Sequence, residues 1–559
     1  MGSPKRVFKS IISLFLAVLI MFMPLGDMTF NQEAEAATSF VTVRFHYSRT
    51  DSTYNSWYVW GWPQDGAGAW YAFSEKDENG NGVATVTNVS SDTQKFGFLV
   101  TTKDWTKDYG TDRYVNLSDV TAGIVDVYLN AGQADFTRNV SADAFVLSNA
   151  RVTGTNKISV DWSSKQSAIP DINIYDVTDN KARTDIASKT LNGDTGFDII
   201  FTDKVSLGHE YKITYGSNNS TTAKVDYDSD FFESNYTYTG DDLGSSYSSA
   251  GTTFKVWAPT ADAVSVLLFD AGSIDKNSKY IGEYLMEGGS FDTKGVWSKT
   301  VTGDLKNKYY IYKVNIAGNT NYCMDPYSVT GCTINEDVLA DTTQSTPVNQ
   351  LSSGQRSMVT DLASTNPVGW EADKHVITDN KTDASVYEIS IRDFSIDPDS
   401  GISAGNRMKY LAFTETGTTL RNEGKVSTGI DYIKKLGVSY IQIMPSFDFL
   451  GTNEVNGENY NWGYNPVNYN IPEGAFSSNP YDGNVRVNEY KQMVQAIHKQ
   501  DMGVIMDVVY NHVNSDDTFC FNQLVPGYFF RGSNGSGCGN DVASERKMVR
   551  KYIVDSVKY

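Results

Sequence analysis

The chain has 559 residues, which at roughly 150 residues per domain predicts three to five domains rather than one. Its 47 Lys and Arg residues against 67 Asp and Glu residues give a net charge of −20, which argues against nucleic acid and anionic membrane surfaces as partners. Tyr, Phe and Trp number 34, 27 and 10, so the composition predicts folded, aromatic-rich domains and excludes general disorder.

The N-terminus has the pattern of a secretory signal. Three positive charges precede an apolar run from Ile11 to Met23, and a small-residue site follows at 34–36. The run is shorter than the roughly 20 residues that span a bilayer. We therefore expect a signal peptide over 1–36 and a secreted mature protein without an integral membrane segment.

Four cysteines in a secreted chain could form two bridges. The local pairs Cys323 with Cys332 and Cys520 with Cys538 are the expected ones, and four free thiols are the alternative.

From about residue 40 to 350, short alternating apolar and polar runs are separated by turns rich in Asn, Gly, Asp and Ser. This texture predicts three β-sandwich modules in series, over 38–130, 142–226 and 230–350. The middle module has no concentrated aromatic or polar cluster, and we expect a spacer there.

After about residue 379 strands alternate with helices, as in a parallel sheet with crossover helices. Strands are predicted over 386–391, 438–444 and 504–509. Helices are predicted from Ser427 or Thr428 to Gly437, around 490–497, and from about Asp541 with Met548, Val549, Ile553 and Val557 facing inward. The fold class is therefore three β-sandwich modules followed by an incomplete (β/α)8 TIM barrel over 379–559.

The first module contains a cluster of tryptophans. Trp60 and Trp62 at i and i+2 project from one face of a strand, where two indoles would form a flat apolar platform. Sugar rings stack on such surfaces, and Trp105, Lys107 and Asp112 add a further ring and hydrogen-bonding groups. The alternative is that these tryptophans are core residues.

Residues Asp77, Asn79, Asn81 and Gly82 imitate the start of a calcium-binding loop, but Asn88 stands at the twelfth position, where a bidentate Glu is needed. A hairpin turn is the better interpretation.

Two β-modules resemble known families. Tyr58, Trp60, Trp62, Trp105, Lys107 and Asp112 match the starch-binding module that precedes many bacterial pullulanases. Residues 252–260, with the apolar strand 264–269, look like the β-sandwich that precedes the barrel in debranching and branching enzymes. That module often packs on the barrel, so Trp257 is expected in the core.

The loop Tyr460 to Pro466 reads Tyr-Asn-Trp-Gly-Tyr-Asn-Pro and closely resembles the type I pullulanase signature. Active-site loops of barrel enzymes follow the strand C-termini. The resemblance therefore implies that Trp462 and Tyr464 contact substrate.

The run from Asp507 to His512 matches the first short motif of the α-amylase superfamily. The resemblance implies that Asp507 and His512 line the subsite of the sugar whose bond is cut, and that Asn511 lies near a structural calcium. For Asp507 a hydrogen-bonded structural carboxylate remains the alternative. No other cofactor is expected.

The family implies a secreted glycoside hydrolase that cleaves α-1,6-glucosidic linkages in pullulan, amylopectin and limit dextrins. Retaining glycosidases need two carboxyl groups about 5 to 5.5 Å apart. In the resembled family these come from later barrel strands, so we expect the pair beyond Tyr559, in a chain that binds α-glucan but is inactive as printed.

Two alternatives remain open. One is an amylopullulanase or another branch-point hydrolase. The other is a non-catalytic starch-binding surface protein, and attachment to the cell surface through a missing C-terminal part is also left open.

Overall fold

The computed structural model describes residues 40–559 except 52, 65, 78, 91, 121–122, 142–146, 163–165, 217–218, 273–277, 335–347, 349–350, 352–354 and 533. The expected signal peptide lies outside these residues. Within them, no helix is long and apolar enough to span a membrane.

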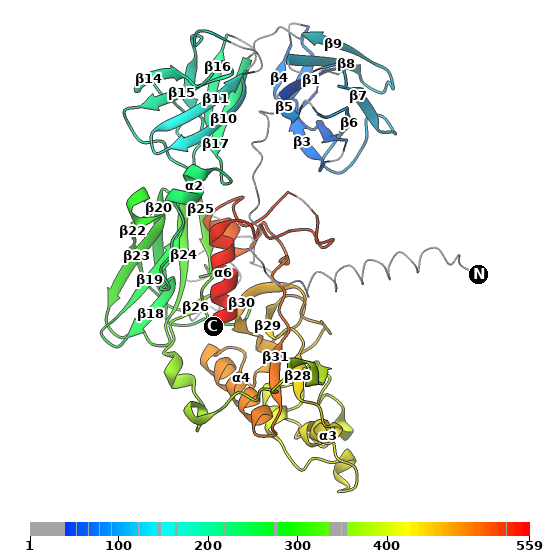
Figure 1. Cartoon of the computed structure of the whole chain (residues 1–559), viewed down its shortest axis with the longest axis vertical. Helices are drawn as coiled ribbons and strands as arrows, with labels where there is room; N and C mark the ends of the chain where they lie inside the picture. Colours follow the sequence, from blue (N-terminus) through cyan, green and yellow to red (C-terminus); the bar gives the residue numbers. More distant parts are fainter. Residues whose placement is uncertain are drawn as a thin grey trace, which may run out of the picture.

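The first module, at the upper right of Figure 1, is built from two sheets with the strand orders β4-β5-β1-β8-β9 and β3-β2-β6-β7. Alternation directs Phe45 of β1 and Phe98 of β6 to the interior, where their ring centroids lie 4.8 Å apart. The strands are β1 Phe40–Ser48, β2 Tyr58–Pro63, β3 Ala69–Ala72, β4 Glu75–Lys76, β5 Gly82–Ser90, β6 Lys95–Thr101, β7 Arg113–Asn116, β8 Gly123–Asn130 and β9 Phe136–Ser141.

The calcium-like segment of this module is a hairpin turn between β4 and β5, as predicted. The Asp77 carboxylate accepts hydrogen bonds from the backbone N–H groups of Asn79 and Asn81, both at 2.9 Å, and contacts His46. Its oxygens are therefore already engaged by the turn and by His46 of β1.

The second module forms a single hydrogen-bonded sheet of eight strands, in the order β13-β12-β16-β17-β10-β11-β15-β14, rather than two separate sheets. A parallel pairing of β10 with β17 joins its two halves. The strands are β10 Leu147–Gly154, β11 Lys157–Trp162, β12 Asn173–Asp176, β13 Lys181–Ala182, β14 Ile186–Leu191, β15 Gly196–Phe201, β16 Tyr211–Tyr215 and β17 Asn219–Val225, and the short helix α2 Asp230–Asn235 follows.

The third module has two sheets, ordered β18-β19-β23-β22 and β21-β20-β24-β25, with β26 beside β24. It lies against the red helix α6 in Figure 1, and its core is continuous with that of the C-terminal part. The strands are β18 Gly244–Ser248, β19 Gly251–Trp257, β20 Ala263–Phe269, β21 Tyr280–Leu285, β22 Glu287–Gly288, β23 Val296–Thr302, β24 Tyr309–Ile316, β25 Asn319–Cys323 and β26 Ser357–Met358.

Trp257 is a core residue, as predicted. Its indole N–H donates to the carbonyl oxygens of Tyr236 at 2.7 Å and Lys294 at 3.1 Å. Its ring lies 4.8 Å from that of Tyr528 in the barrel portion, so the third module packs on the barrel.

The barrel portion contains the predicted parallel sheet, with strand order β27-β28-β31. Its strands are shorter than predicted, and a two-stranded hairpin of β29 and β30 lies beside it. The elements are β27 Val386–Ile389, α3 Gly429–Leu436, β28 Tyr440–Ile443, β29 Phe447–Phe449, β30 Pro466–Pro472, α4 Gly483–His498, β31 Gly503–Met506, α5 Cys520–Leu524 and α6 Lys547–Lys558.

Two details of the predicted third helix are wrong. Helix α6 begins at Lys547 rather than near Asp541, because Asp541 and Val542 pair with His512 and Phe530 in antiparallel β-bridges. Met548 and Val549 are buried, but Val557 is exposed.

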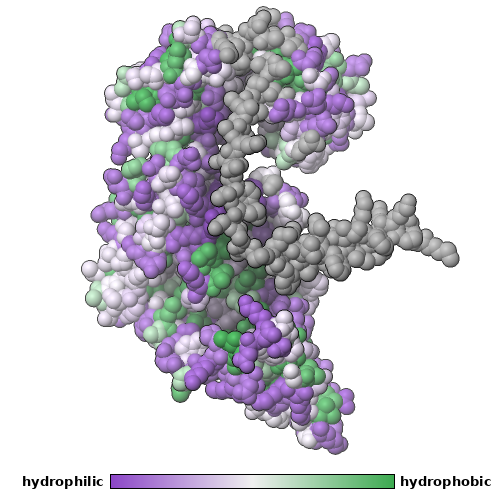
Figure 2. Space-filling view, viewed as in Figure 1, coloured by the Kyte–Doolittle hydropathy of each residue, from purple (hydrophilic) through white to green (hydrophobic). Residues whose placement is uncertain are grey.

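Val557 lines an apolar hollow of about 530 Å³, together with Met506 and Val508. Figure 2 shows hydrophobic residues gathered in the middle of the face, at the height where Figure 1 places α6 and β30.

The predicted disulfides are also absent: all four cysteines are free thiols. Cys323, Cys332 and Cys520 are buried, whereas Cys538 is exposed, so Cys520 and Cys538 lie in different surroundings. The Cys332 sulfur instead accepts a hydrogen bond from the Arg356 backbone N–H at 3.2 Å.

Candidate functional site

The first module presents an aromatic face opposite its core. In β2, Val59 and Gly61 are buried while Trp60 and Trp62 point outward, as the alternation predicted. The Trp60 ring centroid lies 5.4 Å from that of Trp105, whose side chain is 50% exposed. The structure thus brings Trp60 and Trp105 together on a solvent-facing surface, which suits a stacking ligand better than a core.

The predicted flat platform is not formed. The planes of Trp60 and Trp105 make an angle of 68°, and Trp62 meets Tyr114 edge to face at 6.0 Å. Aromatic rings prefer such edge-to-face packing because of their quadrupoles. The surface is therefore stepped rather than planar.

Sequence reasoning missed Trp70 on β3, which lies opposite Trp60 in the strand register. Its ring centroid is 4.9 Å from that of Trp60 and 5.1 Å from that of Trp105. Lys103 was also missed; its Nζ lies 4.9 Å from the Trp70 ring centroid. The predicted Lys107 and Asp112 are exposed in the segment between β6 and β7.

In the barrel portion, three of the four predicted site residues meet directly after β31. The Tyr464 hydroxyl donates to Asp507 Oδ2 at 2.8 Å, and His512 Nε2 donates to the Tyr464 carbonyl oxygen at 3.0 Å. Burial of the phenol and the nearby Asp507 carboxylate raise the pKa of Tyr464 to about 12, so the hydroxyl remains a donor at neutral pH. Trp462 is 63% exposed.

Carboxylates near the first barrel strand extend the site. The Gln442 amide donates to Glu388 Oε2 at 3.0 Å, and the two residues are register partners in β27 and β28. Just after β27, Asp393 Oδ2 accepts a hydrogen bond from the Tyr460 hydroxyl at 3.0 Å. Both acids lie at or just after the carboxyl end of a predicted strand, and this position in the sequence could have indicated them as site residues.

The segment around Asp541 and Val542 supports the His512 segment. The Val542 N–H donates to the Asn511 carbonyl oxygen at 3.0 Å, and Asn511 Oδ1 lies 3.1 Å from His512 Nδ1. The buried Asp541 carboxylate accepts from the N–H of Gly535 at 2.6 Å, which orders this segment.

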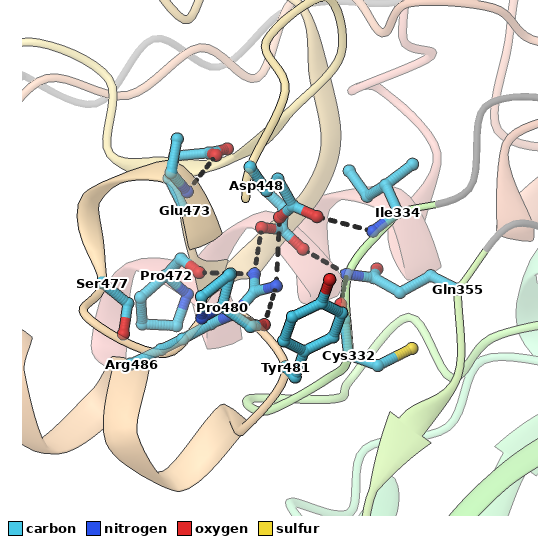
Figure 3. Close-up of polar contacts among 12 residues, drawn as sticks. Cys332, Ile334, Gln355, Asp448, Pro472, Glu473, Ser477, Pro480, Tyr481 and Arg486 are labelled. Atoms are coloured by element: carbon cyan, nitrogen blue, oxygen red, sulfur yellow. Dashed lines mark hydrogen bonds and ion pairs between the residues drawn. The ribbon is translucent and has the colours of Figure 1, made fainter. Parts of the chain in front are cut away.

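A buried ionic cluster surrounds Arg486 and is drawn in Figure 3. Arg486 of α4, which is fully buried, places Nη1 2.8 Å from Asp448 Oδ1 and Nη2 3.0 Å from Glu454 Oε1. Glu473 follows β30 and accepts the Ala475 N–H at 2.8 Å. Since Asp448 lies on β29 and Glu454 in the connection between β29 and β30, the cluster ties the start of that connection to α4.

Burial dominates the electrostatics of this cluster. It raises the pKa of Asp448 to about 8 and that of Glu473 well above its ordinary value, with the neighbouring carboxylates acting in the same direction for Glu473. Burial also raises the pKa of Glu454, against the influence of Arg486. Three carboxyl groups thus face one guanidinium.

The same three carboxylates have oxygens close enough to share a metal ion. The Arg486 guanidinium, however, already contacts two of them and supplies the positive charge there. Among the described residues, the groups of three or more acidic, histidine or cysteine side chains that could share a metal ion do not include His512, the neighbour of Asn511. A calcium ion at Asn511 therefore remains a prediction from the sequence.

Three family models match parts of the chain. Residues 41–138 match "Bacterial pullanase-associated domain", 242–328 match "Carbohydrate-binding module 48 (Isoamylase N-terminal domain)", and 422–527 match "Alpha amylase, catalytic domain". The last match includes the Tyr464 and Asp507 positions.

Two relatives of the chain are pullulanases. The pullulanase of Bacillus subtilis is 36% identical over 363 residues, covering 64% of this chain and 44% of the relative. Pullulanase A of Streptococcus pneumoniae is 27% identical over 558 residues, covering 93% and 42%. The chain is similar to pullulanases over most of its length.

Solved structures agree with this pullulanase-like organisation. The pullulanase of Anoxybacillus sp. LM18-11 complexed with maltotriose has a TM-score of 0.58 at 34% identity, covering 75% of this chain and 56% of that one. The pullulanase of Bacillus acidopullulyticus has a TM-score of 0.56 at 29% identity, covering 83% and 50%. The pullulanase-like chain thus spans about half the length of its relatives, or less.

Proposed function

We propose that the chain is the glucan-binding and sugar-positioning part of a secreted pullulanase, a retaining hydrolase of α-1,6-glucosidic linkages in pullulan, amylopectin and limit dextrins. The observation that carries this proposal is the contact of Tyr464 with Asp507 and His512 at the end of β31, in a chain similar to pullulanases. A hydrogen-bonded acid and imidazole at that position suit the binding of sugar hydroxyls.

In this proposal the first and third modules have different functions. The first, with Trp60, Trp62 and Trp105, binds α-glucan by stacking, and Lys107 and Asp112 hydrogen-bond its hydroxyls. The third module supports the barrel, consistent with the burial of Trp257. A related pullulanase has been solved complexed with maltotriose, which supports a short α-glucan as ligand.

The catalytic pair is proposed to lie outside the printed chain, which would then bind glucan without hydrolysing it. Retention requires two carboxyl groups about 5 to 5.5 Å apart, and the Asp507 carboxylate is engaged by the Tyr464 hydroxyl. Incubation of purified residues 37–559 with pullulan should release no maltotriose. Released maltotriose would overturn this part of the proposal.

Specificity and export are tested separately. In a longer gene product that is active, cleavage of pullulan but not of amylose is expected, whereas cleavage of both would identify an amylopullulanase.

Secretion predicts that the mature protein in the medium begins at Ala37, which N-terminal sequencing checks.

A further inference from the structure

A cleft of about 440 Å³ lies between the first and second modules. One wall is the outward face of β1 and β5, where Arg44 and Thr85 are register partners. The other wall is β17, from which Ser220 and Thr222 face the cleft. Its volume is within the range of small-molecule sites.

The chemistry of the cleft is that of a site for a neutral, hydroxylated ligand. Hydroxyl and amide side chains line both walls, including those of Thr85, Thr87, Asn88, Ser220 and Thr222. Such groups both donate and accept hydrogen bonds, as sugar hydroxyls do.

The charged groups of the cleft already have protein partners. Arg44 donates two hydrogen bonds to Asp126, at 2.7 and 2.9 Å. Lys224 lies 2.6 Å from Glu210, and Glu75 lies 4.0 Å from Lys212 across the module boundary. The cleft therefore offers no free positive charge of its own to an anion, which agrees with a net charge of −20.

Trp70 connects this cleft to the aromatic face. It lines one end of the cleft, and on the aromatic face its ring lies 4.9 Å from that of Trp60 and 5.1 Å from that of Trp105. Trp70 thus belongs both to the aromatic face and to the lining of the cleft.

We propose that the cleft is an extended α-glucan subsite, in which the second module forms a wall of the binding site instead of serving as a spacer. The Asn88 amide, which donates to Asn149 Oδ1 at 3.4 Å, and the Glu75–Lys212 pair join the two modules at its border. This inference rests on the proposed binding of glucan by the first module.

The test is calorimetric titration of purified residues 37–559 with maltotriose and maltoheptaose. The short ligand is expected to occupy only the aromatic face, and the long one also the cleft, so maltoheptaose should bind more tightly. The variants Thr222→Arg and Thr87→Arg fill the cleft from opposite walls. Each should remove about two hydrogen bonds and weaken maltoheptaose binding by roughly tenfold, while leaving maltotriose binding unchanged.

Matched variants separate the possible failures. Thr190→Arg, at an exposed position of β14 that does not line the cleft, should bind both ligands as the wild type does. Equal affinity of the wild type for both ligands, or unchanged maltoheptaose binding in both cleft variants, would overturn the extended subsite. If Trp60→Ala then still abolishes maltotriose binding, the proposed function of the first module stands. If the wild type binds neither ligand, both proposals fail.

Discussion

At the scale of single residues, the buried Arg486 guanidinium provides the positive charge that faces three buried carboxyl groups. Full ionisation of Asp448, Glu454 and Glu473 would leave two uncompensated negative charges in a buried place, which is strongly unfavourable. The raised pKa values mean that the folded chain retains protons that the unfolded chain releases.

This cluster makes the stability of the folded chain depend on pH. Where the folded state binds more protons, the free energy of unfolding falls as pH rises, here between about pH 4, the ordinary value of a carboxyl group, and the pKa of about 8 for Asp448. One such proton changes the free energy of unfolding by about 1.4 kcal/mol per pH unit. We predict that the temperature at the midpoint of thermal unfolding is lower at pH 8 than at pH 5.

The variant Asp448→Asn should flatten this profile, because the amide carries no proton to lose and the buried Gln355 Oε1, which has no hydrogen-bond partner, can turn to accept from it. Calorimetric melting at several pH values checks this. A variant as steep as the wild type would contradict the assignment to this cluster.

The proximity of site residues was predictable where a short motif contains them. Tyr464, Asp507 and His512 belong to two local motifs, and the fold brings them together. Arg486 and Trp70 were not predictable, because their partners are set by the pairing of a loop with α4 and of β3 with β2.

At the scale of elements, a histidine joins the second and third modules. His209, before β16, lies 3.0 Å from Asp176 of its own module and 3.4 Å from Asp262, in the turn before β20. The contacts with Asp262 and Asp176 outweigh burial and raise the pKa of His209 to about 9. The stabilisation of the folded state by protonated His209 is thus complete below about pH 6.5 and is lost as pH rises through about 9.

The variant Asp262→Asn should lower the pKa of His209, while Asp176 keeps it above the ordinary value. An NMR titration of ¹³C-labelled histidine rings, assigned with His209→Asn, measures this. An unchanged midpoint in Asp262→Asn would show that the inter-module contact does not form in solution.

The elements themselves followed the sequence closely where periodicity was strong. Helix α3 begins after Thr428 and ends at Gly437, which adopts the left-handed conformation that favours glycine. Helix α6 begins later than predicted because Asp541 and Val542 form β-bridges with His512 and Phe530, a tertiary pairing that outweighs local helix propensity.

At the scale of the whole molecule, Trp257 links the third module to the barrel. The variant Trp257→Phe removes two hydrogen bonds and leaves two carbonyl groups to find new partners, so we expect a loss of roughly 2 to 4 kcal/mol of stability. The exposed control Trp462→Phe should stay within about 0.5 kcal/mol of the wild type. Urea unfolding measures both, and equal stabilities would argue against the buried, hydrogen-bonded placement of Trp257.

The order of modules was predictable from the switch between strand texture and strand-helix alternation. What the sequence could not give is the relation between modules: the common core of the third module and the barrel, and the cleft lined by β5 and β17, depend on contacts between distant segments.

The most direct test of the account is electrophoresis of purified residues 37–559 through native gels with and without pullulan. The wild type should be strongly retarded by pullulan, and Trp60→Ala should migrate nearly as it does in the gel without polysaccharide. Equal retardation of the wild type and Trp60→Ala would contradict glucan binding by the aromatic face.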